Sequence, residues 1–208
     1  MTHRLLCLVL VLLAPAVHAG DTPTRADLQR TLELYTRSVV KVSSGRGGRG
    51  GREAGLGVIV GAEGQVLTSA HHLTPGGERE AARVEFAGQS LPATVVLTNA
   101  LLQVAVLAAP AGTYPAVPVH VSAESPAGQW LIGVVPGRGH EQDTPAAAQA
   151  REASAPFFDV ELALPPGSPL FDTRGRLVAV AVERRGRGCR ALPLGAVKQE
   201  LVTRASPP

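Results

Sequence analysis

Cysteine, aromatic residues and lysine are all scarce in this chain. Only two cysteines, Cys7 and Cys189, occur in 208 residues, which excludes a framework of several disulfides and a cysteine-rich zinc module. Phenylalanine, tryptophan and tyrosine together make up 3 % of the residues, so a buried core has to be built from valine, leucine and alanine. Lysine occurs only at Lys41 and Lys198, and arginine carries nearly all of the positive charge.

A large excess of charge of either sign is also absent. The 20 basic and 17 acidic residues give a formal net charge of +3, which is too small to predict nucleic acid or an anionic membrane as the main partner. Hydrophobic residues make up 45 % and charged residues 18 % of the chain. This composition can bury a core in one or two domains and is not that of a disordered protein.

The chain begins with the features of an export signal. Arg4 precedes an apolar run over residues 5–13 that is too short for a permanent transmembrane helix. Val17 and Ala19 follow at the positions that a signal peptidase reads. We expect residues 1–19 to be a signal peptide cleaved after Ala19, and the protein to be periplasmic or secreted in a bacterium. A retained N-terminal anchor is the alternative; no second long apolar run follows, so we expect no stable membrane insertion after the signal is removed.

A helical lead-in is predicted within residues 20–37. Thr24 with Asp27 three residues later is typical of a helix start, and apolar residues then recur at spacings of 4, 3 and 4. Residues 38–42 are rich in valine and predict a first strand. Residues 45–52 contain only glycine and arginine, as in some nucleic-acid-binding segments. In an exported chain we favour a loop between strands.

Short strands separated by glycine and proline turns fill the remainder of the chain. The expected strands are residues 55–60, 65–70, 82–86, 93–97 and 102–107 in a first series, then 129–135, 157–164, 177–183 and 190–193 in a second. We expect a linker near residues 108–118, a surface loop over 137–154, a closing helix over 194–203 and a tail at 205–208. Many short strands with a late helix favour an all-β fold of one or two small barrels.

Several segments resemble the trypsin-like serine proteases, in particular the bacterial HtrA type. Residues 55–60 (GLGVIV) and 64–71 (GQVLTSAH) are similar to the strand, tight turn and Leu-Thr-x-x-His segment of that family's first barrel. Residues 104–107 (VAVL), 171–180 (FDTRGRLVAV) and 191–198 (ALPLGAVK) are similar to later family segments, in the same order. The resemblance implies a trypsin-like double β-barrel over residues 38–204, with a cleft between the barrels. It carries over no PDZ domain, which HtrA-type enzymes commonly have after the protease.

Part of the catalytic machinery of that family is missing. Such an enzyme needs a hydroxyl nucleophile, an imidazole base, a carboxylate beside the imidazole and backbone N–H groups for the oxyanion. The resemblance places the base at His71 and puts Gln103 where the family has aspartate. No acidic residue occurs between Glu85 and Glu124. A neutral amide at this position can favour the wrong histidine tautomer, which costs roughly 10⁴-fold in turnover.

The nucleophile loop is also shortened. Where the family reads Asn-Pro-Gly-Asn-Ser-Gly-Gly-Pro-Leu, residues 165–170 read Pro-Pro-Gly-Ser-Pro-Leu. Anchoring both ends makes Ser168 the candidate nucleophile, whereas an ungapped alignment from the trailing Pro-Leu puts Pro166 there. Gly167 is the candidate oxyanion-hole donor. Pro169 has no N–H and restricts the residue before it, so we do not expect the hole to form.

No metal or cofactor is predicted. His71 and His72 are adjacent, and neighbouring residues on a strand point to opposite faces. No cysteine or carboxylate lies at a metal-ligand spacing from them, and the glycine-rich residues 45–51 lack the lysine and the hydroxyl of a phosphate-binding loop.

Besides a small β-barrel stability or assembly factor that merely shares ancestry with the proteases, two hypotheses for the function stay open. The first is an exported pseudoprotease that binds an extended peptide or a protein partner along the cleft or an exposed strand edge. The second is a weak serine endopeptidase with a Ser168/His71 dyad in which Gln103 orients the histidine. The sequence predicts no oligomeric state.

Overall fold

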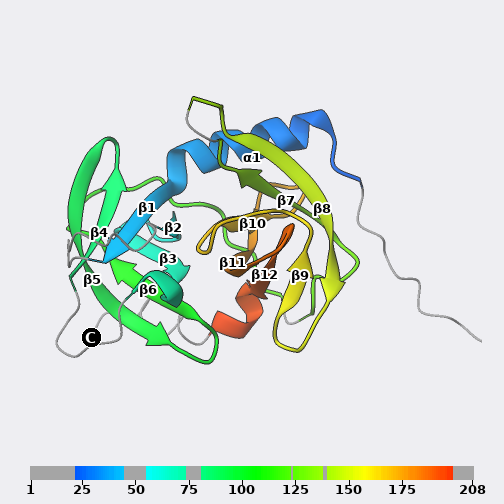
Figure 1. Ribbon diagram of the computed structural model, residues 1–208. Helices are drawn as coiled ribbons and strands as arrows, with labels where there is room; N and C mark the ends of the chain where they lie inside the picture. Colours follow the sequence, from blue (N-terminus) through cyan, green and yellow to red (C-terminus); the bar gives the residue numbers. More distant parts are fainter. Residues whose placement is uncertain (1–21, 45–54, 74–80, 123, 138–139, 199–208) are drawn as a thin grey trace, which may run out of the picture.

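The computed structural model describes residues 22–44, 55–73, 81–122, 124–137 and 140–198. Two closed antiparallel barrels of six strands each lie side by side (Figure 1). The strand order is β1-β2-β3-β6-β5-β4 in the first barrel and β10-β11-β12-β9-β8-β7 in the second. The predicted double β-barrel is therefore confirmed. The expected signal peptide, the glycine–arginine loop and the 205–208 tail lie outside the described residues.

The strand bounds agree with most of the predicted strands. The strands of the first barrel are β1 (Val39–Ser44), β2 (Gly55–Ile59), β3 (Gln65–Ser69), β4 (Ala81–Phe86), β5 (Gln89–Asn99) and β6 (Val104–Ala108). Those of the second are β7 (Trp130–Val135), β8 (Thr144–Glu152), β9 (Phe158–Val160), β10 (Pro169–Phe171), β11 (Leu177–Arg185) and β12 (Gly188–Pro193). Two short 3-10 helices, η1 (Ala70–His72) and η2 (Leu194–Val197), complete the fold with the helix α1 (Arg25–Ser38).

Helix α1 begins as its sequence predicts. The Thr24 hydroxyl accepts a hydrogen bond from the Asp27 N–H (3.3 Å), and the Asp27 carboxylate accepts one from the Thr24 N–H (2.9 Å). The Thr24 hydroxyl also donates to the Asp27 carboxylate (2.6 Å), and this bond, together with the one from the Thr24 N–H, lowers the pKa of Asp27. The helix packs over β7 and β8 of the second barrel and then runs directly into β1 of the first (Figure 1). It is therefore a strap across both barrels.

The prediction of a surface loop over residues 137–154 is wrong, because this region contains strand β8. The segment has four alanines and a proline, which have low strand propensity, so the local sequence gives no strand signal. Strand β8 pairs with β7 along its length, from Trp130–Gln149 to Val135–Thr144, and with β9 at its end. Pairing with the neighbouring strands β7 and β9 thus stabilises a strand that the local propensity does not predict.

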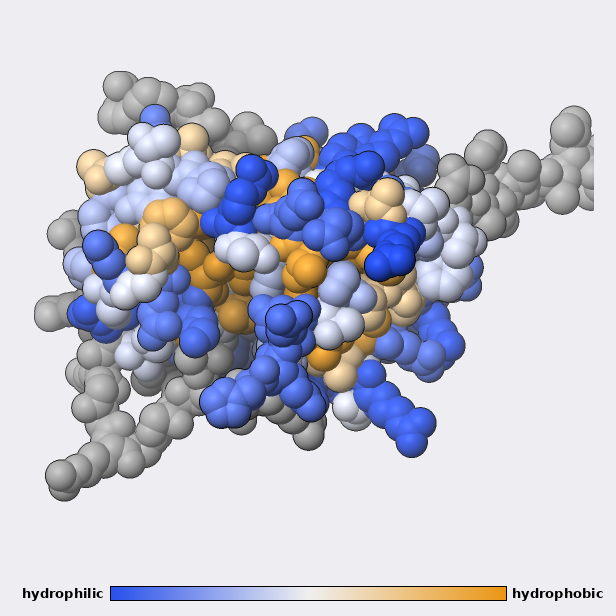
Figure 2. Space-filling view, turned by 90° about the horizontal axis from the view of Figure 1, so that it is seen from above, coloured by the Kyte–Doolittle hydropathy of each residue, from blue (hydrophilic) through white to orange (hydrophobic). Residues whose placement is uncertain are grey.

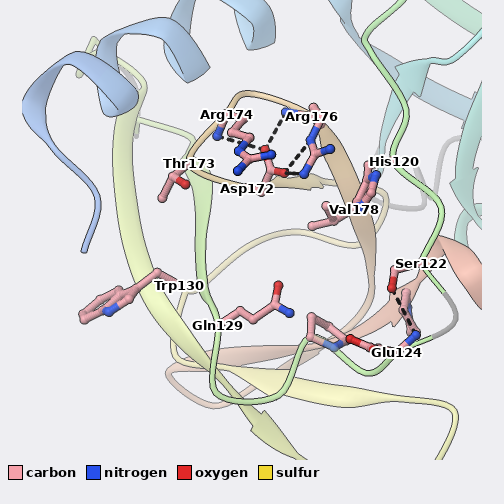
Figure 3. A pocket seen from close by; sticks show the side chains of 12 residues that line it. His120, Ser122, Glu124, Gln129, Trp130, Asp172, Thr173, Arg174, Arg176 and Val178 are labelled. Atoms are coloured by element: carbon pink, nitrogen blue, oxygen red, sulfur yellow. Dashed lines mark hydrogen bonds and ion pairs between the residues drawn. The ribbon is translucent and has the colours of Figure 1, made fainter. Parts of the chain in front are cut away.

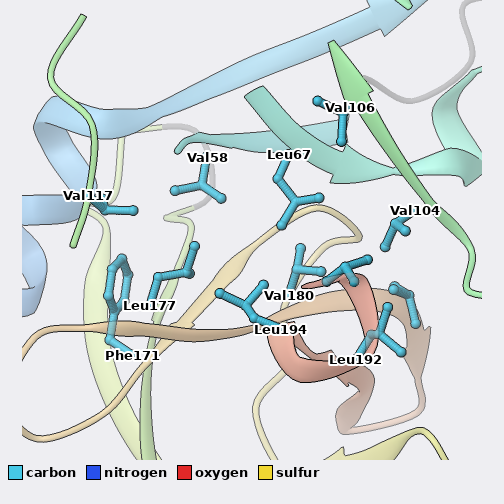
Figure 4. Close-up of a cluster of buried hydrophobic side chains, with 12 residues drawn as sticks. Val58, Leu67, Val104, Val106, Val117, Phe171, Leu177, Val180, Leu192 and Leu194 are labelled. Carbon is cyan, nitrogen blue, oxygen red and sulfur yellow. The ribbon is translucent and has the colours of Figure 1, made fainter. Parts of the chain in front are cut away.

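Both faces of the strands between the barrels are buried. On β6, Ala105 and Leu107 point into the first barrel, while Val104 and Val106 point toward the second. This arrangement explains the unbroken apolar run that predicted the strand. The shared cluster between the barrels (Figure 4) consists of Val58, Leu67, Val104, Val106, Val117, Phe171, Leu177, Val180, Val182, Leu192, Leu194 and Val197. The two barrels are thus joined by a continuous hydrophobic core.

The connection between the barrels spans residues 109–129, longer than the predicted linker. It is hydrogen-bonded first to one barrel and then to the other: the Val117 N–H donates to the Ile59 carbonyl (3.0 Å), and the His120 N–H donates to the Leu177 carbonyl (2.8 Å). The face seen in Figure 2 is covered mostly by hydrophilic side chains, with hydrophobic ones showing near its middle. Within the described ranges, no helix is long and apolar enough to cross a bilayer.

Candidate functional site

The segments that carry the predicted site residues meet at the boundary between the barrels. The Ala70 N–H in η1 donates to the Gln103 carbonyl (2.9 Å), which joins the end of β3 to the start of β6. The Ser69 hydroxyl donates to the Val182 carbonyl in the second barrel (3.0 Å). The Leu56 N–H donates to the Pro166 carbonyl (3.1 Å) and so connects the shortened loop to the first barrel. The fold therefore brings His71, Gln103 and Ser168 to one region.

His71 lies in the 3-10 turn η1 and is exposed. Its backbone N–H donates to the Ser69 hydroxyl (3.3 Å), which caps this turn. Its imidazole makes no hydrogen bond to another described residue. The structure therefore places the predicted base at the surface of the boundary, with its ring nitrogens available.

Gln103 has a left-handed backbone (φ +57°), which is uncommon for a residue other than glycine. Its carbonyl accepts the Ala70 N–H and faces the Ser69 hydroxyl at 3.4 Å. Its side-chain oxygen is buried and has no hydrogen-bond partner among the described residues. The Gln103 amide oxygen therefore does not orient the His71 imidazole in this structure.

Ser168 is completely buried, with no exposed surface. Its hydroxyl donates to the carbonyl of Pro165 at 2.6 Å, within the same turn, and its own carbonyl accepts the Ala181 N–H at 2.8 Å. Within the described part of the chain, no hydrogen bond links Ser168 to His71. A substrate can reach this hydroxyl only if the turn moves.

The backbone N–H groups of the turn are also occupied. The Gly167 N–H donates to the Ala181 carbonyl (2.7 Å), and the Ser168 N–H donates to the Pro165 carbonyl (3.2 Å). The next residue, Pro169, has no N–H. None of these three positions therefore presents a free donor to an oxyanion.

The turn of residues 165–168 packs tightly against strand β2 of the first barrel. Gly167 has a positive φ of +87°, and a Cβ atom at this position would overlap with the Leu56 carbonyl oxygen. The same oxygen accepts the Thr68 hydroxyl at 2.6 Å, so it is held in place from its own barrel. Only glycine satisfies both the backbone angle and the close approach.

His72, for which no role was predicted, contacts this turn. The residue is 9 % exposed, and its Nε2 atom lies 3.2 Å from the Pro166 carbonyl oxygen. The ring fills the space beside Gly55, where any side chain would collide with it. The pair of adjacent histidines was the signal in the sequence that could have predicted this contact. Neighbouring side chains point in different directions, so if His71 is exposed, His72 faces the protein interior.

Two hollows on the second barrel are lined by none of the candidate site residues. One of about 350 Å³ lies between the 172–176 turn and the connection that carries His120 and Glu124 (Figure 3). A second, of about 540 Å³, shares Ser122, Glu124 and Pro193 with the first. No group of three or more potential metal ligands occurs among the described residues.

Comparisons with known proteins agree with this architecture. The family model described as a trypsin-like peptidase domain matches residues 55–180, more than half of the chain. A search of curated proteins found no significant match.

Solved structures of proteases superpose on most of the chain. The serine endoprotease from Yersinia pestis has a TM-score of 0.70 at 18 % identity, covering 89 % of this chain and 69 % of that one. The active form of the Rv3671c protease from M. tuberculosis has a TM-score of 0.68 at 21 % identity, covering 91 % and 90 %. An inactive form of the same protease has a TM-score of 0.65 at 21 % identity, covering 91 % and 98 %. At these identities the likeness shows the fold alone.

Proposed function

Because the chain belongs to the trypsin-like peptidase domain family, we propose that it is a catalytically impaired member that acts by binding a peptide or protein partner. One observation carries the proposal. The hydroxyl of Ser168, the candidate nucleophile, is buried and donates to the Pro165 carbonyl in a turn packed against the other barrel. A serine protease needs this hydroxyl exposed and within about 2.6–3.2 Å of its base.

Two further features support the same proposal. Gln103 carries no charge, so it cannot balance an imidazolium at His71, and its carbonyl and side-chain oxygens are not bonded to that ring. The Gly167 and Ser168 N–H groups donate to carbonyls of the protein itself, so they are not aimed at a developing oxyanion. Restoring catalysis would require all three changes to be reversed together.

A weak serine endopeptidase is the second candidate function. The exposed imidazole of His71, at the boundary between the barrels, favours it. In this alternative the 165–168 turn opens, Ser168 swings out of its bond to Pro165, and His71 takes its proton. The Ser168 oxygen attacks the peptide carbonyl, the C–N bond breaks as the amine leaves with the proton from His71, and water then hydrolyses the acyl-enzyme.

The proposed location is the periplasm or the outside of a bacterial cell, after cleavage of the signal following Ala19. The support for this is the sequence pattern of residues 1–19. The partner is proposed to be a peptide or protein and not nucleic acid, since the net charge is small.

A fluorophosphonate probe on the purified protein separates the two functions. We expect no covalent labelling of the wild type under conditions in which an active trypsin-fold protease is fully labelled, with folding verified by circular dichroism. Ser168→Ala and the exposed-serine control Ser154→Ala should behave identically to the wild type. Labelling that is lost in Ser168→Ala and retained in Ser154→Ala would show a live nucleophile and replace the proposal with the endopeptidase.

A further inference from the structure

We propose that the outer edge of residues 118–122, together with the adjoining hollow on the second barrel, binds an extended acidic peptide segment of a partner protein. This inference goes beyond the proposed function. It names a surface outside the His71–Ser168 region, and it holds whether or not the protein has peptidase activity.

The segment lies outside the named strands and makes one isolated β-bridge, so its backbone is paired along one edge only. Val119 forms a parallel bridge with Leu177: the Leu177 N–H donates to the Pro118 carbonyl (2.7 Å), and the His120 N–H donates to the Leu177 carbonyl (2.8 Å). In this pattern the backbone groups of Val119 and Val121 point to the opposite edge. Within the described residues, neither their N–H nor their carbonyl groups make a hydrogen bond. They are therefore available to pair with an added strand.

This edge also presents apolar side chains to solvent. The large hydrophobic residues that are exposed in the described part of the chain are Leu101, Val119 and Val121, the two valines at 38 % each. Two of these three residues thus lie on the segment whose outer backbone edge is unpaired. A β-branched, exposed and unpaired edge is the combination that proteins normally cover.

The opposite face of the same segment lines the hollow of about 350 Å³. His120 and Ser122, which alternate with the two valines, both line it. A peptide strand added to the edge would therefore place alternate side chains over the valines and over the hollow. The partner sequence should alternate accordingly, with apolar residues facing Val119 and Val121.

The exposed guanidinium of Arg174 favours an acidic side chain on the other face of the peptide. Asp172 is neutralised internally, because its carboxylate accepts a hydrogen bond from Arg176 Nε (2.7 Å) and forms an ion pair with Arg176 Nη2 (2.7 Å). It also accepts the backbone N–H groups of Arg174 and Arg176 at 3.0 and 2.9 Å. The exposed guanidinium of Arg174 has no ion-pair partner in the described ranges. Figure 3 shows this turn on one side of the open space and Glu124, on the rim, on another. A carboxylate directed toward Arg174 would pair with this cation.

The binding can be measured through Trp130, which is the only tryptophan of the chain and lines the same hollow. The probe is a capped hexapeptide of alternating valine and glutamate, and the comparison peptides replace glutamate by glutamine or by lysine. We expect saturable binding, visible in the Trp130 fluorescence, that weakens in the order glutamate, glutamine, lysine. A valine–glutamate peptide methylated on alternate backbone nitrogens should lose the binding, because it cannot pair with the edge.

Two variants test the two halves of the surface. Val121→Pro removes the outward N–H but leaves the His120 bond to Leu177, and it should weaken binding about five- to tenfold; its control, Val121→Thr, keeps the N–H and should change binding little. Arg174→Ala should weaken binding of the acidic peptide about tenfold and abolish the preference for glutamate over glutamine. Its control, Arg25→Ala, removes an exposed arginine on α1.

Equal binding of the lysine and glutamate peptides, undiminished binding of the methylated peptide, or no saturable binding of any peptide would each overturn the inference. The methylated peptide keeps the test decisive if Val121→Pro does not fold. Because Ser168 and His71 are not altered, a failure here is distinct from a positive result with the fluorophosphonate probe.

Discussion

Replacing Gly167 by alanine tests whether the shortened nucleophile loop joins the two barrels. The new methyl group has two effects. It puts a Cβ on a residue with φ +87°, which costs about 1–2 kcal/mol, and it collides with the Leu56 carbonyl oxygen, which the Thr68 hydroxyl holds in place. Relieving an overlap of this kind against a well-packed neighbour costs about 1–3 kcal/mol more.

Two other glycines separate the effect of the backbone angle from the effect of the collision. Gly128 (φ +81°) and Gly88 (φ +76°) have comparable positive angles, but a Cβ at either would meet no atom within 4 Å. Gly128→Ala and Gly88→Ala therefore report the cost of the backbone angle in the second and first barrels. The difference between Gly167→Ala and these controls measures the contact between the barrels.

The assay is thermal unfolding of the three variants and the wild type by circular dichroism. For a chain of this size, 1 kcal/mol corresponds to about 2–4 °C in Tm, so Gly167→Ala should unfold about 2–12 °C below the two controls. Hydrogen exchange of the Leu56 amide, which donates to Pro166, should become faster only in Gly167→Ala. Equal Tm values for all three variants would refute the idea that this turn is packed against the first barrel.

Three more predictions concern the missing acid, the buried thiol and the first helix. Gln103→Asp restores a carboxylate but should give no hydrolysis of fluorogenic peptides, because Ser168 stays buried; turnover that appears with this single change would contradict the role given to the turn. Burial, and to a smaller extent Asp159, raises the pKa of Cys189 from 9.0 to about 12. The neutral thiol is therefore favoured in the folded state, and its stabilising contribution to the free energy of unfolding is fully present below pH 9. The free energy of unfolding should fall by about 1.4 kcal/mol per pH unit from this group as the pH rises from 9 toward 12. Urea unfolding at several pH values should show a shallower dependence in Cys189→Ala, and an identical slope would count against the burial of the thiol. Thr24→Ala removes the helix cap and should lower Tm by about 2–4 °C, whereas Thr22→Ala, outside the helix, should leave it unchanged.

The family and the fold could be predicted because their signals are local and repeated. The Thr24 cap, the valine-rich strands and the order of the motifs around His71 each depend on neighbouring residues, and together they indicated a double barrel. Strand β8 could not be predicted in this way. Its alanines and proline have no strand preference of their own, and only its pairing with the strands before and after it in the chain, β7 and β9, makes it a strand.

The candidate site was predictable as a set of positions but not as a geometry. The sequence identified His71, Gln103, Gly167 and Ser168 and indicated that the loop is too short. It did not show that the Ser168 hydroxyl donates to Pro165, or that His72 is the histidine in contact with the loop. The first is a bond within a single turn, whose geometry the sequence pattern does not give, and the second joins residues 94 positions apart in the chain.

By itself, then, the sequence determined which chemical groups are present: a histidine at the base position, an uncharged amide at the acid position and one serine in a shortened loop. Only the tertiary structure decided what those groups do to one another. A loop that lacks its usual glycines has too few residues to project its hydroxyl into a cleft. It therefore lies flat against the first barrel, where its backbone groups bond to Leu56 and Ala181. The sequence determines the length of the loop, but the surface against which the loop packs exists only after both barrels have folded.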